Sequence, residues 1–378
     1  MKKYDIVIIG GGPAGSSAAL SLKNSGLKVA LFDKKSFPRE KICGDGLCDR
    51  AINTLKEISP DYYDEFIKEL DPTIISKASL VYKNKQHEFG YGTYGYLVPR
   101  LQFDNFMISR VKRDCANVDL YQNSEIVDTN NIDNGFEIKA KNESYFARLV
   151  IFAVGAHSSL IRKFTQQPFK KEQYGIAVRA YYKGVTGTKN DRVELHFKKQ
   201  YIPGYFWIFP MKNGLSNVGF GYHMKYVSKN SDNLKDIMAD WISNDLKERF
   251  ATAEQVTPLK GGMIPYSANS FNCAGDNYLI AGDAAFLADP FTGGGIGNAM
   301  FSGRQAALQV KRCFDENYFS LVETKKYEEA LKKRMGKEVK RRYNLQVIIS
   351  RHTWLVNVFL FIIRNSSRFK KLLKSYYN

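Results

Sequence analysis

Glycines near the amino terminus are spaced for contact with a phosphate group. Gly10, Gly12 and Gly15 form a G-x-G-x-x-G pattern that also contains Pro13 and Ala14. The pattern follows an apolar, β-branched run and precedes a run of small residues, which predicts a strand, a tight turn and a helix. The first glycine permits the turn, the second lets a pyrophosphate approach the backbone, and the third allows close helix–strand packing. Because a helix start supplies N–H donors, these residues predict a dinucleotide-phosphate site.

An acidic residue follows the next predicted strand. Residues 28–32 read Lys-Val-Ala-Leu-Phe, and Asp33 stands directly after them. An acid at this place is suited to accept hydrogen bonds from the ribose of an adenine nucleotide. We assign Lys34 and Arg39, a little further on, to the same site. The strand–helix–strand unit implies a parallel sheet, but it does not by itself separate FAD from NAD.

A second glycine-rich loop lies far along the chain, in residues 277–300. A short apolar strand is predicted there, followed by an acid, a loop and a helix. An acid at the end of a strand suits ribityl hydroxyls, and a helix start stabilises the negative charge of a reduced isoalloxazine ring. Together with the amino-terminal motif, this loop predicts FAD as the cofactor. Its candidate residues are Gly282, Asp283, Pro290, Gly293, Gly294, Gly295 and Ile296.

The two motifs resemble those of the p-hydroxybenzoate-hydroxylase-like flavoproteins, and over residues 1–312 the similarity is greatest to the geranylgeranyl reductase family. Residues 39–46, REKICGDG, resemble the cysteine–glycine segment of that family and contribute Cys43 and Gly44. Arg100 matches the arginine that the superfamily places near the flavin nucleotide. The resemblance implies a flavin-binding fold with a substrate sheet, and reduction of isolated double bonds in a prenyl chain on a lipid, quinone or diphosphate. The Y-x-W-x-F-P core of the family is matched by Tyr205, Trp207, Phe209 and Pro210.

One segment departs from the superfamily pattern. Residues 153–162, AVGAHSSLIR, resemble the fingerprint A-D-G-A-x-S-x-x-x-R but carry Val154 in place of the aspartate. This departure weakens any nicotinamide site that the resemblance would imply here. The electron donor therefore stays open between NAD(P)H and ferredoxin.

Saturation of an unactivated alkene needs a hydride, a proton for the neighbouring carbon and a dry channel for the chain. On one strand, the three aromatic residues of the Y-x-W-x-F-P core would face the same side and form a channel wall; an ordinary aromatic sheet core is the alternative. Cys43 stands near Lys41, whose charge would lower the pKa of the thiol and make it a candidate proton donor. Two other interpretations are that Cys43 is a small side chain beside the cofactor, or that it forms a reversible disulfide with Cys48.

Two further classes of function stay open. A flavin monooxygenase or halogenase acting on an aromatic or carrier-bound substrate shares the fold and the Gly282–Asp283 motif. Tryptophan-dependent halogenases carry W-x-W-x-I-P, and here Tyr205 and Phe209 replace the first tryptophan and the isoleucine, which disfavours that group. The third class is a flavoprotein without catalysis that docks on membranes through basic C-terminal helices.

The balance of 56 Lys and Arg against 38 Asp and Glu leaves a net charge of +18. This excess favours an anionic membrane surface or an acidic small molecule, and no motif for nucleic acid accompanies it. Residues 321–375 are expected to be helical and basic, with an apolar island at 353–363 that is too short to span a bilayer but suited to its interface. No metal-ligand spacing, cysteine pair or signal peptide is evident. We expect a cytoplasmic protein without a metal, peripheral on the inner face of the membrane if these helices bind lipid.

The length of 378 residues favours two associated domains. The predicted fold class is α/β, with a Rossmann-like FAD-binding domain interwoven with a mostly antiparallel β-sheet substrate domain, plus C-terminal helices. The expected boundaries are 1–75, 100–168 and 264–312 for the FAD-binding domain, 76–99 and 169–263 for the substrate-binding domain, and 313–378 for the basic C-terminal region.

Overall fold

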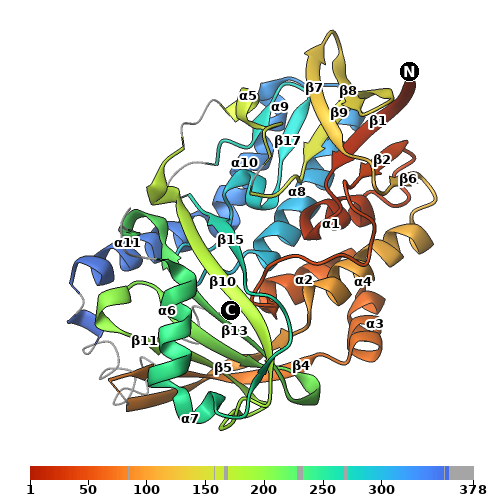
Figure 1. Ribbon diagram of the computed structural model, residues 1–378. Coiled ribbons are helices and arrows are strands. Elements are labelled where there is room, and N and C mark those ends of the chain that lie inside the picture. The colour runs from red at the N-terminus through yellow and green to blue at the C-terminus, as the bar shows by residue number, and fades with distance from the viewer. Residues whose placement is uncertain are drawn as a thin grey trace.

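Two β-sheets form the centre of the molecule, with helices packed around them (Figure 1). The computed structural model describes residues 1–356 except 84, 157, 166–168, 228–232, 268–270 and 353. The chain enters each sheet more than once, because the strands of the second sheet are inserted between strands of the first. The predicted fold class, a parallel nucleotide-binding sheet interwoven with a mostly antiparallel one, is confirmed.

The first sheet has a parallel core in the order β17-β9-β1-β2-β6, and its outer strands add antiparallel pairs. Parallel strands end at the same edge of a sheet, so the segments after β1, β2 and β17 lie close together. These segments carry Gly10, Asp33 and Gly282, and residues far apart in the sequence thereby meet at one edge. The strands are β1 (Lys2–Ile9), β2 (Val29–Phe32), β6 (Val118–Tyr121), β7 (Ile126–Ile132), β8 (Gly135–Ala140), β9 (Ser144–Phe152), β16 (Ala274–Gly275) and β17 (Tyr278–Ile280).

The second sheet follows the order β14-β10-β13-β12-β11-β4-β5-β3, and β15 also pairs with β10. All its pairs are antiparallel except that of β4 with β11. The strands are β3 (Gly46–Leu47), β4 (Thr73–Tyr82), β5 (Lys85–Leu97), β10 (Tyr174–Lys183), β11 (Arg192–Phe197), β12 (Tyr205–Pro210), β13 (Leu215–His223), β14 (Glu254–Gln255) and β15 (Lys260–Pro265).

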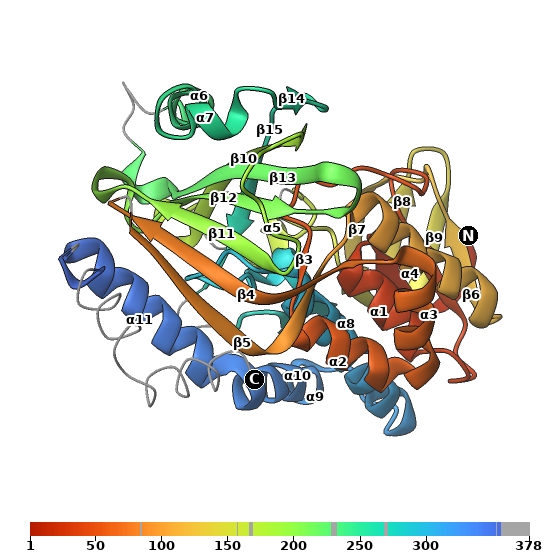
Figure 2. The same cartoon turned by 90° about the horizontal axis from the view of Figure 1, so that it is seen from below.

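Helices pack on both sheets. Helices α1 and α8 cross so closely that a Cβ added to Gly303 would lie 2.0 Å from the carbonyl oxygen of Ala14. Helices α6 and α7 cover one face of the second sheet, and α11 runs along its other side (Figure 2). The helices are α1 (Pro13–Ser21), α2 (Asp49–Ile58), α3 (Pro60–Leu70), α4 (Arg100–Asp114), α5 (Arg162–Thr165), α6 (Leu234–Asp240), α7 (Lys247–Phe250), α8 (Ile296–Asp315), α9 (Leu321–Thr324), α10 (Lys326–Leu331) and α11 (Lys337–Arg351).

Some element ends differ from expectation. The helix expected over residues 13–25 ends at Ser21, because the chain turns at Asn24 and Gly26, which have φ values of 60° and 75°. The expected C-terminal helix is divided into α9, α10 and α11. Residues 357–363 of the apolar island lie outside the described residues. The domain boundaries stay a prediction.

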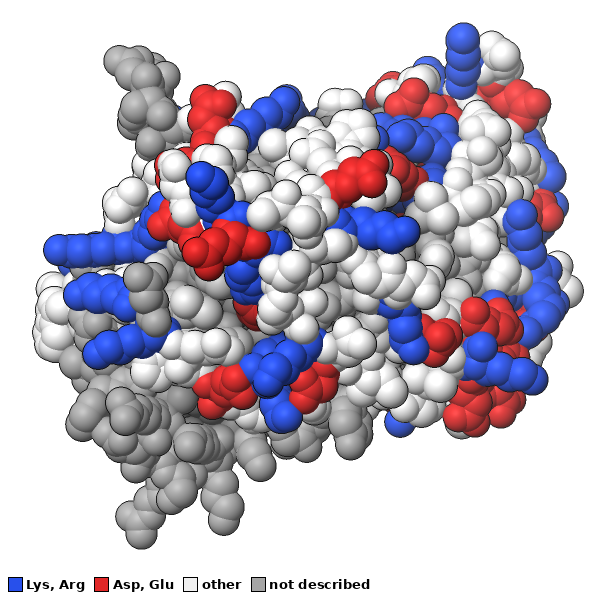
Figure 3. Space-filling model, turned by 60° about the horizontal axis from the view of Figure 1, so that its bottom comes forward, with Lys and Arg blue, Asp and Glu red and all other residues white. Residues whose placement is uncertain are grey.

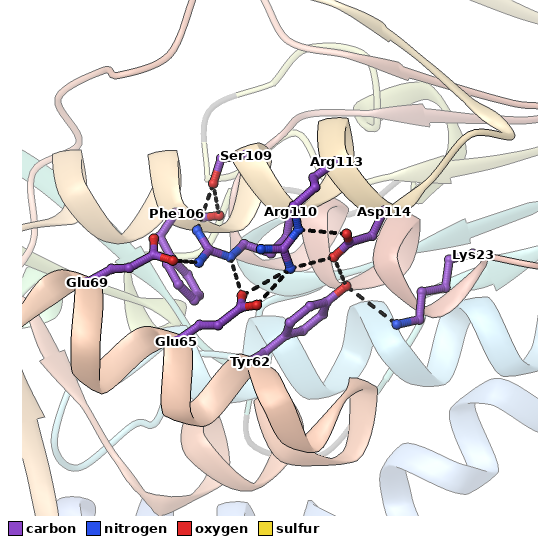
Figure 4. A network of polar contacts seen from close by, with 9 residues as sticks. All are labelled: Lys23, Tyr62, Glu65, Glu69, Phe106, Ser109, Arg110, Arg113 and Asp114. Carbon is purple, nitrogen blue, oxygen red and sulfur yellow. Dashed lines mark hydrogen bonds and ion pairs between the residues drawn. The ribbon is translucent and has the colours of Figure 1, made fainter.

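A polar network fastens α3 to α4, the helix that begins with Arg100 (Figure 4). Arg110 donates to Glu65 at 2.9 Å, and Arg113 contacts both Glu65 and Asp114. The Tyr62 hydroxyl donates to Asp114 at 2.7 Å. The Arg110 guanidinium is almost fully buried, and an unpaired charge at such a site would destabilise the fold. Its contacts with carboxylates offset this loss of hydration.

A second ionic cluster lies between the second sheet and its covering helices. Glu194 on β11 accepts from Arg249 of α7 at 2.5 and 2.9 Å and lies 3.1 Å from the Nε2 atom of His196. Burial acts to raise the pKa of Glu194, but hydrogen bonds from His196 and Arg249 outweigh it and hold the pKa at about 2. The ionised carboxylate thus stabilises the fold.

We expect Glu194→Gln to lower the free energy of unfolding by about 2 kcal/mol near neutral pH. The folded pKa lies below the unfolded one, so the stabilisation is present above the unfolded value of about 4.5 and is lost as the pH falls towards about 2. Urea unfolding across this range should therefore show the two proteins converging in acid. An equal difference at every pH would contradict the assignment.

Candidate active site

One cavity of about 1110 Å³ lies between the two sheets and collects the predicted residues. Two of those residues do not line it. Gly15 packs inside the fold, where an added Cβ would lie 1.8 Å from the carbonyl oxygen of Gly10, and Pro210 is buried at the end of β12 opposite Ser216. The residues that do line it are Gly10, Gly12, Pro13, Ala14, Asp33, Lys34, Arg39, Cys43, Gly44, Arg100, Tyr205, Trp207, Phe209, Gly282, Asp283, Pro290, Gly293, Gly294, Gly295 and Ile296.

The turn between β1 and α1 leaves room for a ligand against the backbone. Gly10 has a φ of 108°, and a Cβ added to it would lie 2.3 Å from the carbonyl oxygen of Ala153. At Gly12, which precedes the first residue of α1, an added Cβ would meet only the Nη2 atom of Arg39, at 3.6 Å. Any side chain at position 10 would therefore clash with the backbone of Ala153. The space beside Gly12, at the positive end of helix α1, is open.

Arg39 joins two buried acids beside this turn. Its Nη2 atom donates to Asp33 at 3.2 Å, and its Nη1 atom lies 3.3 Å from Asp104. Asp33 also accepts from the N–H groups of Gly11 and Lys35, at 2.9 and 3.0 Å. The Nε atom of Arg39 is buried and has no hydrogen-bond partner among the described residues. A buried donor next to an open helix start fits the pyrophosphate of FAD.

The second glycine-rich loop is held by an acid that the sequence did not single out. Asp289 accepts from the N–H groups of Phe291 and Thr292, at 2.9 and 2.7 Å, and pairs with Arg342 of α11. The Tyr205 hydroxyl donates to the carbonyl oxygen of Thr292 at 2.5 Å and so ties the second sheet to the loop. In the sequence, the only indication that Asp289 is a turn residue is its position directly before Pro290.

The aromatic side chains of β12 alternate as expected. Tyr205, Trp207 and Phe209 line the cavity, whereas Phe206 faces the other way and stacks on Trp241 with ring centres 5.3 Å apart. The aromatic wall is therefore a surface of the cavity and not only part of a sheet core.

Two glycines on the neighbouring strand make room for this wall. Gly219 and Gly221 of β13 lie opposite Trp207 and Tyr205. A Cβ added to Gly219 would lie 2.2 Å from a ring atom of Trp207. Sequence reasoning missed both, although alternating glycines within a strand signal a close approach of other atoms.

Asp45 is a further residue that sequence reasoning missed. Its carboxylate is fully buried and accepts from the Tyr181 hydroxyl, from Asn217 at 2.7 Å and from the N–H group of Arg100 at 3.1 Å. Burial raises the pKa of Asp45, and these hydrogen bonds act in the opposite direction. The indication of Asp45 in the sequence is that an acidic residue stands within the glycine-containing segment that carries Cys43.

Asn217 extends this network to the aromatic wall. It accepts from the indole nitrogen of Trp207 at 2.9 Å and donates to the carbonyl oxygen of Cys43 at 2.8 Å. Phe209 packs on the same segment, where an added Gly44 Cβ would lie 3.3 Å from its ring. The network therefore positions the Trp207 ring relative to the Cys43 segment.

The expected activation of Cys43 by Lys41 is wrong. Burial in the cavity wall raises the pKa of the Cys43 thiol, and the cation that partly opposes this is Arg100. Arg100 itself is held by Asp104 at 2.6 and 2.8 Å. Cys43 and Cys48 are both free cysteines, so the disulfide considered from the sequence is not formed in this structure. Cys43 is therefore a neutral thiol near neutral pH.

We expect the Asp45→Asn protein to retain flavin but to have a free energy of unfolding lower by about 1–3 kcal/mol. The NH2 group of the asparagine would face one of the donors that now bond to the carboxylate, and that donor would lose its acceptor. Turnover should fall as Asn217 and Trp207 lose their fixed orientation. Thermal unfolding, flavin content and steady-state kinetics would check this. Asp61→Ala, on the exposed surface of α3, is the matched control; equal kinetics for both variants would contradict the role of Asp45.

Comparison with known proteins decides the family. A sequence profile of the pyridine nucleotide-disulphide oxidoreductases matches residues 4–188, and one of the geranylgeranyl reductase catalytic domain matches residues 173–263. An uncharacterized protein of Methanosarcina barkeri is 30% identical over 93% of this chain and 84% of its own length. The chain belongs to the geranylgeranyl reductase family. It is an FAD-dependent oxidoreductase.

Other relatives in the geranylgeranyl reductase family have names that refer to prenyl lipids or to quinones. Digeranylgeranylglycerophospholipid reductase 2 of Methanopyrus kandleri is 28% identical over 92% of this chain and 87% of its own. Menaquinone reductase of Mycobacterium tuberculosis is 28% identical over 80% of this chain and 75% of its own.

Solved structures share the fold. A geranylgeranyl bacteriochlorophyll reductase-like protein of Thermoplasma acidophilum has a TM-score of 0.86 at 23% identity and covers 97% of this chain and 92% of its own. A flavin-dependent brominase has a TM-score of 0.80 at 19% identity, with 100% of this chain and 94% of its own covered. The fold therefore does not separate reductases from halogenases.

Proposed function

We propose that this protein reduces isolated C=C bonds of a geranylgeranyl-type prenyl chain on a lipid, quinone or diphosphate. The observation that carries the proposal is a single cavity in which the residues suited to FAD adjoin an apolar aromatic wall. The matched geranylgeranyl reductase catalytic profile covers that wall. Curated relatives named for digeranylgeranylglycerophospholipid and menaquinone support the same substrate class.

Residues of both glycine-rich segments hold FAD in this proposal. Gly12, the start of α1 and Arg39 bind the pyrophosphate, and Asp33 accepts from the ribose. Asp283 accepts from the ribityl chain, while Gly293 to Ile296 bring the N-terminus of α8 to the isoalloxazine ring. Lys34, Gly44 and Pro290 also line the cavity.

The chemistry divides between cofactor and protein. Bound FAD, when reduced, supplies a hydride to one alkene carbon. The Cys43 thiol, kept neutral by burial, gives its proton to the neighbouring carbon, and the Arg100 guanidinium stabilises the thiolate until solvent returns a proton. Trp207 and Tyr205 exclude water and orient the chain. The product is the saturated bond, heavier by two hydrogens.

Mass spectrometry of a polyprenyl mixture incubated with chemically reduced holo-protein tests the proposal. Products heavier by pairs of hydrogens and formed without air support reduction. Products that carry added oxygen or halogen and form only in air would establish the monooxygenase or halogenase alternative instead. Chemical reduction makes the test independent of the electron donor, NAD(P)H or ferredoxin.

We also propose that α11 faces an anionic membrane surface. Lys333, Lys337, Lys340 and Arg341 are exposed on one side of this region, next to the exposed Ile348. Over much of the face shown in Figure 3, Lys and Arg are interspersed with Asp and Glu, and several basic side chains project together at its left edge. Among the described residues, no helix has both the length and the apolar character needed to cross a bilayer.

Vesicles containing anionic lipid should therefore bind the protein more tightly than neutral vesicles. Exchanging Lys337, Lys340 and Arg341 for glutamine should remove most of that difference, because each basic residue contributes about 1 kcal/mol near such a surface. Exchange of three basic residues elsewhere, Lys28, Lys112 and Lys235, serves as the control of equal charge. Equal loss in both triple variants would contradict the proposed surface.

A further inference from the structure

The cavity ends in three buried polar side chains on the side remote from Asp45. His223 of β13, Tyr266 after β15 and Gln346 of α11 all line it and are 7%, 3% and 5% exposed. The rings of His223 and Tyr266 lie 5.5 Å apart. Asn217, which contacts Asp45, lies six residues before His223 on the same strand, a separation of about 20 Å. Between Asn217 and His223 on this strand lie Gly219 and Gly221, against which the aromatic wall packs.

Two of these polar groups have unmet hydrogen-bonding capacity. The Tyr266 hydroxyl and the Oε1 atom of Gln346 are buried, and neither has a hydrogen-bond partner at ordinary distance among the described residues. The Gln346 side chain nevertheless lies near enough to the Tyr266 hydroxyl to oppose the rise in its pKa that burial causes, so the two polar groups face the same space. A buried polar atom left unpaired costs about 1–3 kcal/mol, so its presence in a cavity wall favours a ligand that satisfies it.

His223 adds a donor to this end of the cavity. Its Nδ1 atom accepts from the N–H group of Lys225 at 3.2 Å, which leaves Nε2 to carry the ring proton in the neutral form. Burial, helped by the charge of Lys225, lowers the pKa of His223 to about 4. The imidazole is therefore uncharged near neutral pH.

The cationic side chains that line the cavity belong to other parts of it. On β10, Arg179 pairs with Gly219, whereas the residue opposite His223 is Gly175, four residues or about 13 Å away. Lys260 pairs with Arg179 and forms a salt bridge with Glu40. The other lining cations are Lys34, Lys35, Arg39, Lys41 and Arg100.

We infer that His223, Tyr266 and Gln346 bind an uncharged oxygen at the head of the prenyl substrate, in a hydroxyl, ether or carbonyl group. A diphosphate joined directly to the chain would need cationic partners, and the described lining at this end supplies neutral donors and acceptors. Ile264 and Tyr205 line the cavity beside Gly293 of the glycine-rich loop and provide apolar surface for the chain. The inference rests on the proposed function and narrows its substrate class.

Binding of three probes to oxidised holo-protein tests the inference. The probes are geranylgeraniol, geranylgeranyl diphosphate and the hydrocarbon of the same chain without oxygen, with Kd measured from the change in flavin absorbance. Wild-type protein should bind the alcohol more tightly than the diphosphate. Tyr266→Phe should weaken binding of the alcohol about 5- to 10-fold, the loss of one hydrogen bond, and leave binding of the hydrocarbon unchanged.

Tyr182→Phe is the matched control, because its hydroxyl donates to Gln255 away from the cavity lining. Gln346→Met changes a residue of α11 at the same end of the cavity. It should also weaken binding of the alcohol and leave binding of the hydrocarbon unchanged. Tighter binding of the diphosphate, or equal weakening of alcohol and hydrocarbon, would overturn the inference. So would loss of flavin from Tyr266→Phe, which would assign the hydroxyl to the cofactor. Absence of binding by all three probes would refute the proposed function itself.

Discussion

A Trp207→Ala protein should keep its flavin and lose about 100-fold or more in kcat/KM for a prenyl substrate. Trp207 lies on the second sheet, and its indole N–H, the only donor of its side chain, donates to Asn217, so the side chain forms no hydrogen bond to the glycine-rich turns. Without the indole, the cavity widens opposite Gly219 and admits water, and the chain is no longer held against the reacting centre. Flavin content by absorbance and turnover by product mass would separate the two effects.

Two variants on the same strand sharpen this test. Trp207→Phe retains a ring in the wall and should recover part of the activity. Phe206→Leu changes the opposite face, which packs on Trp241, and should lower thermal stability with little change in KM. Normal turnover by Trp207→Ala would remove this residue from the substrate site.

An Asp33→Ala protein should be purified largely without flavin. The substitution removes the acceptor for the N–H groups of Gly11 and Lys35 and leaves Arg39 with one acid in place of two. It also removes the proposed ribose acceptor. Hydrogen bonds to a charged group contribute about 1.5–3 kcal/mol each, so the Kd for FAD should rise about 100-fold or more.

Titration of the protein with FAD, followed by flavin fluorescence, measures this Kd. Asp61→Ala removes an exposed acid from α3 and should bind FAD as the wild type does. Circular dichroism of the Asp33→Ala protein would show whether the fold persists without cofactor. Tight FAD binding by a folded Asp33→Ala protein would contradict the role of this acid.

Local sequence determined the phosphate-binding turn and the two strands beside it. Glycine spacing at Gly10, Gly12 and Gly15 acts through backbone geometry, and that geometry depends on neighbours in the chain. The alternation of Tyr205, Trp207 and Phe209 likewise predicted one face of a strand, because side chains of a strand alternate with a period of two. The fold class followed from these local patterns and from the family resemblance.

The chemical state of the site depended on tertiary structure. Lys41 is near Cys43 in the sequence, yet burial and Arg100 decide the pKa of the thiol, because both desolvation and Coulomb interaction depend on distance in space. Asp45, Gly219 and Asp289 acquire their roles from partners on other elements and carried only weak signals.

His223, Tyr266 and Gln346 come from two strands' ends and a C-terminal helix, and no spacing in the chain joins them. They are buried together only when α11 packs against the second sheet, and within the described part of the chain the Tyr266 hydroxyl and the Gln346 Oε1 atom have no partner at ordinary hydrogen-bond distance. The sequence by itself thus determined which cofactor the turns can hold, since backbone turns are local. The tertiary structure decided which polar groups the cavity presents to a substrate, since burial and hydrogen bonding join residues that are distant in the chain.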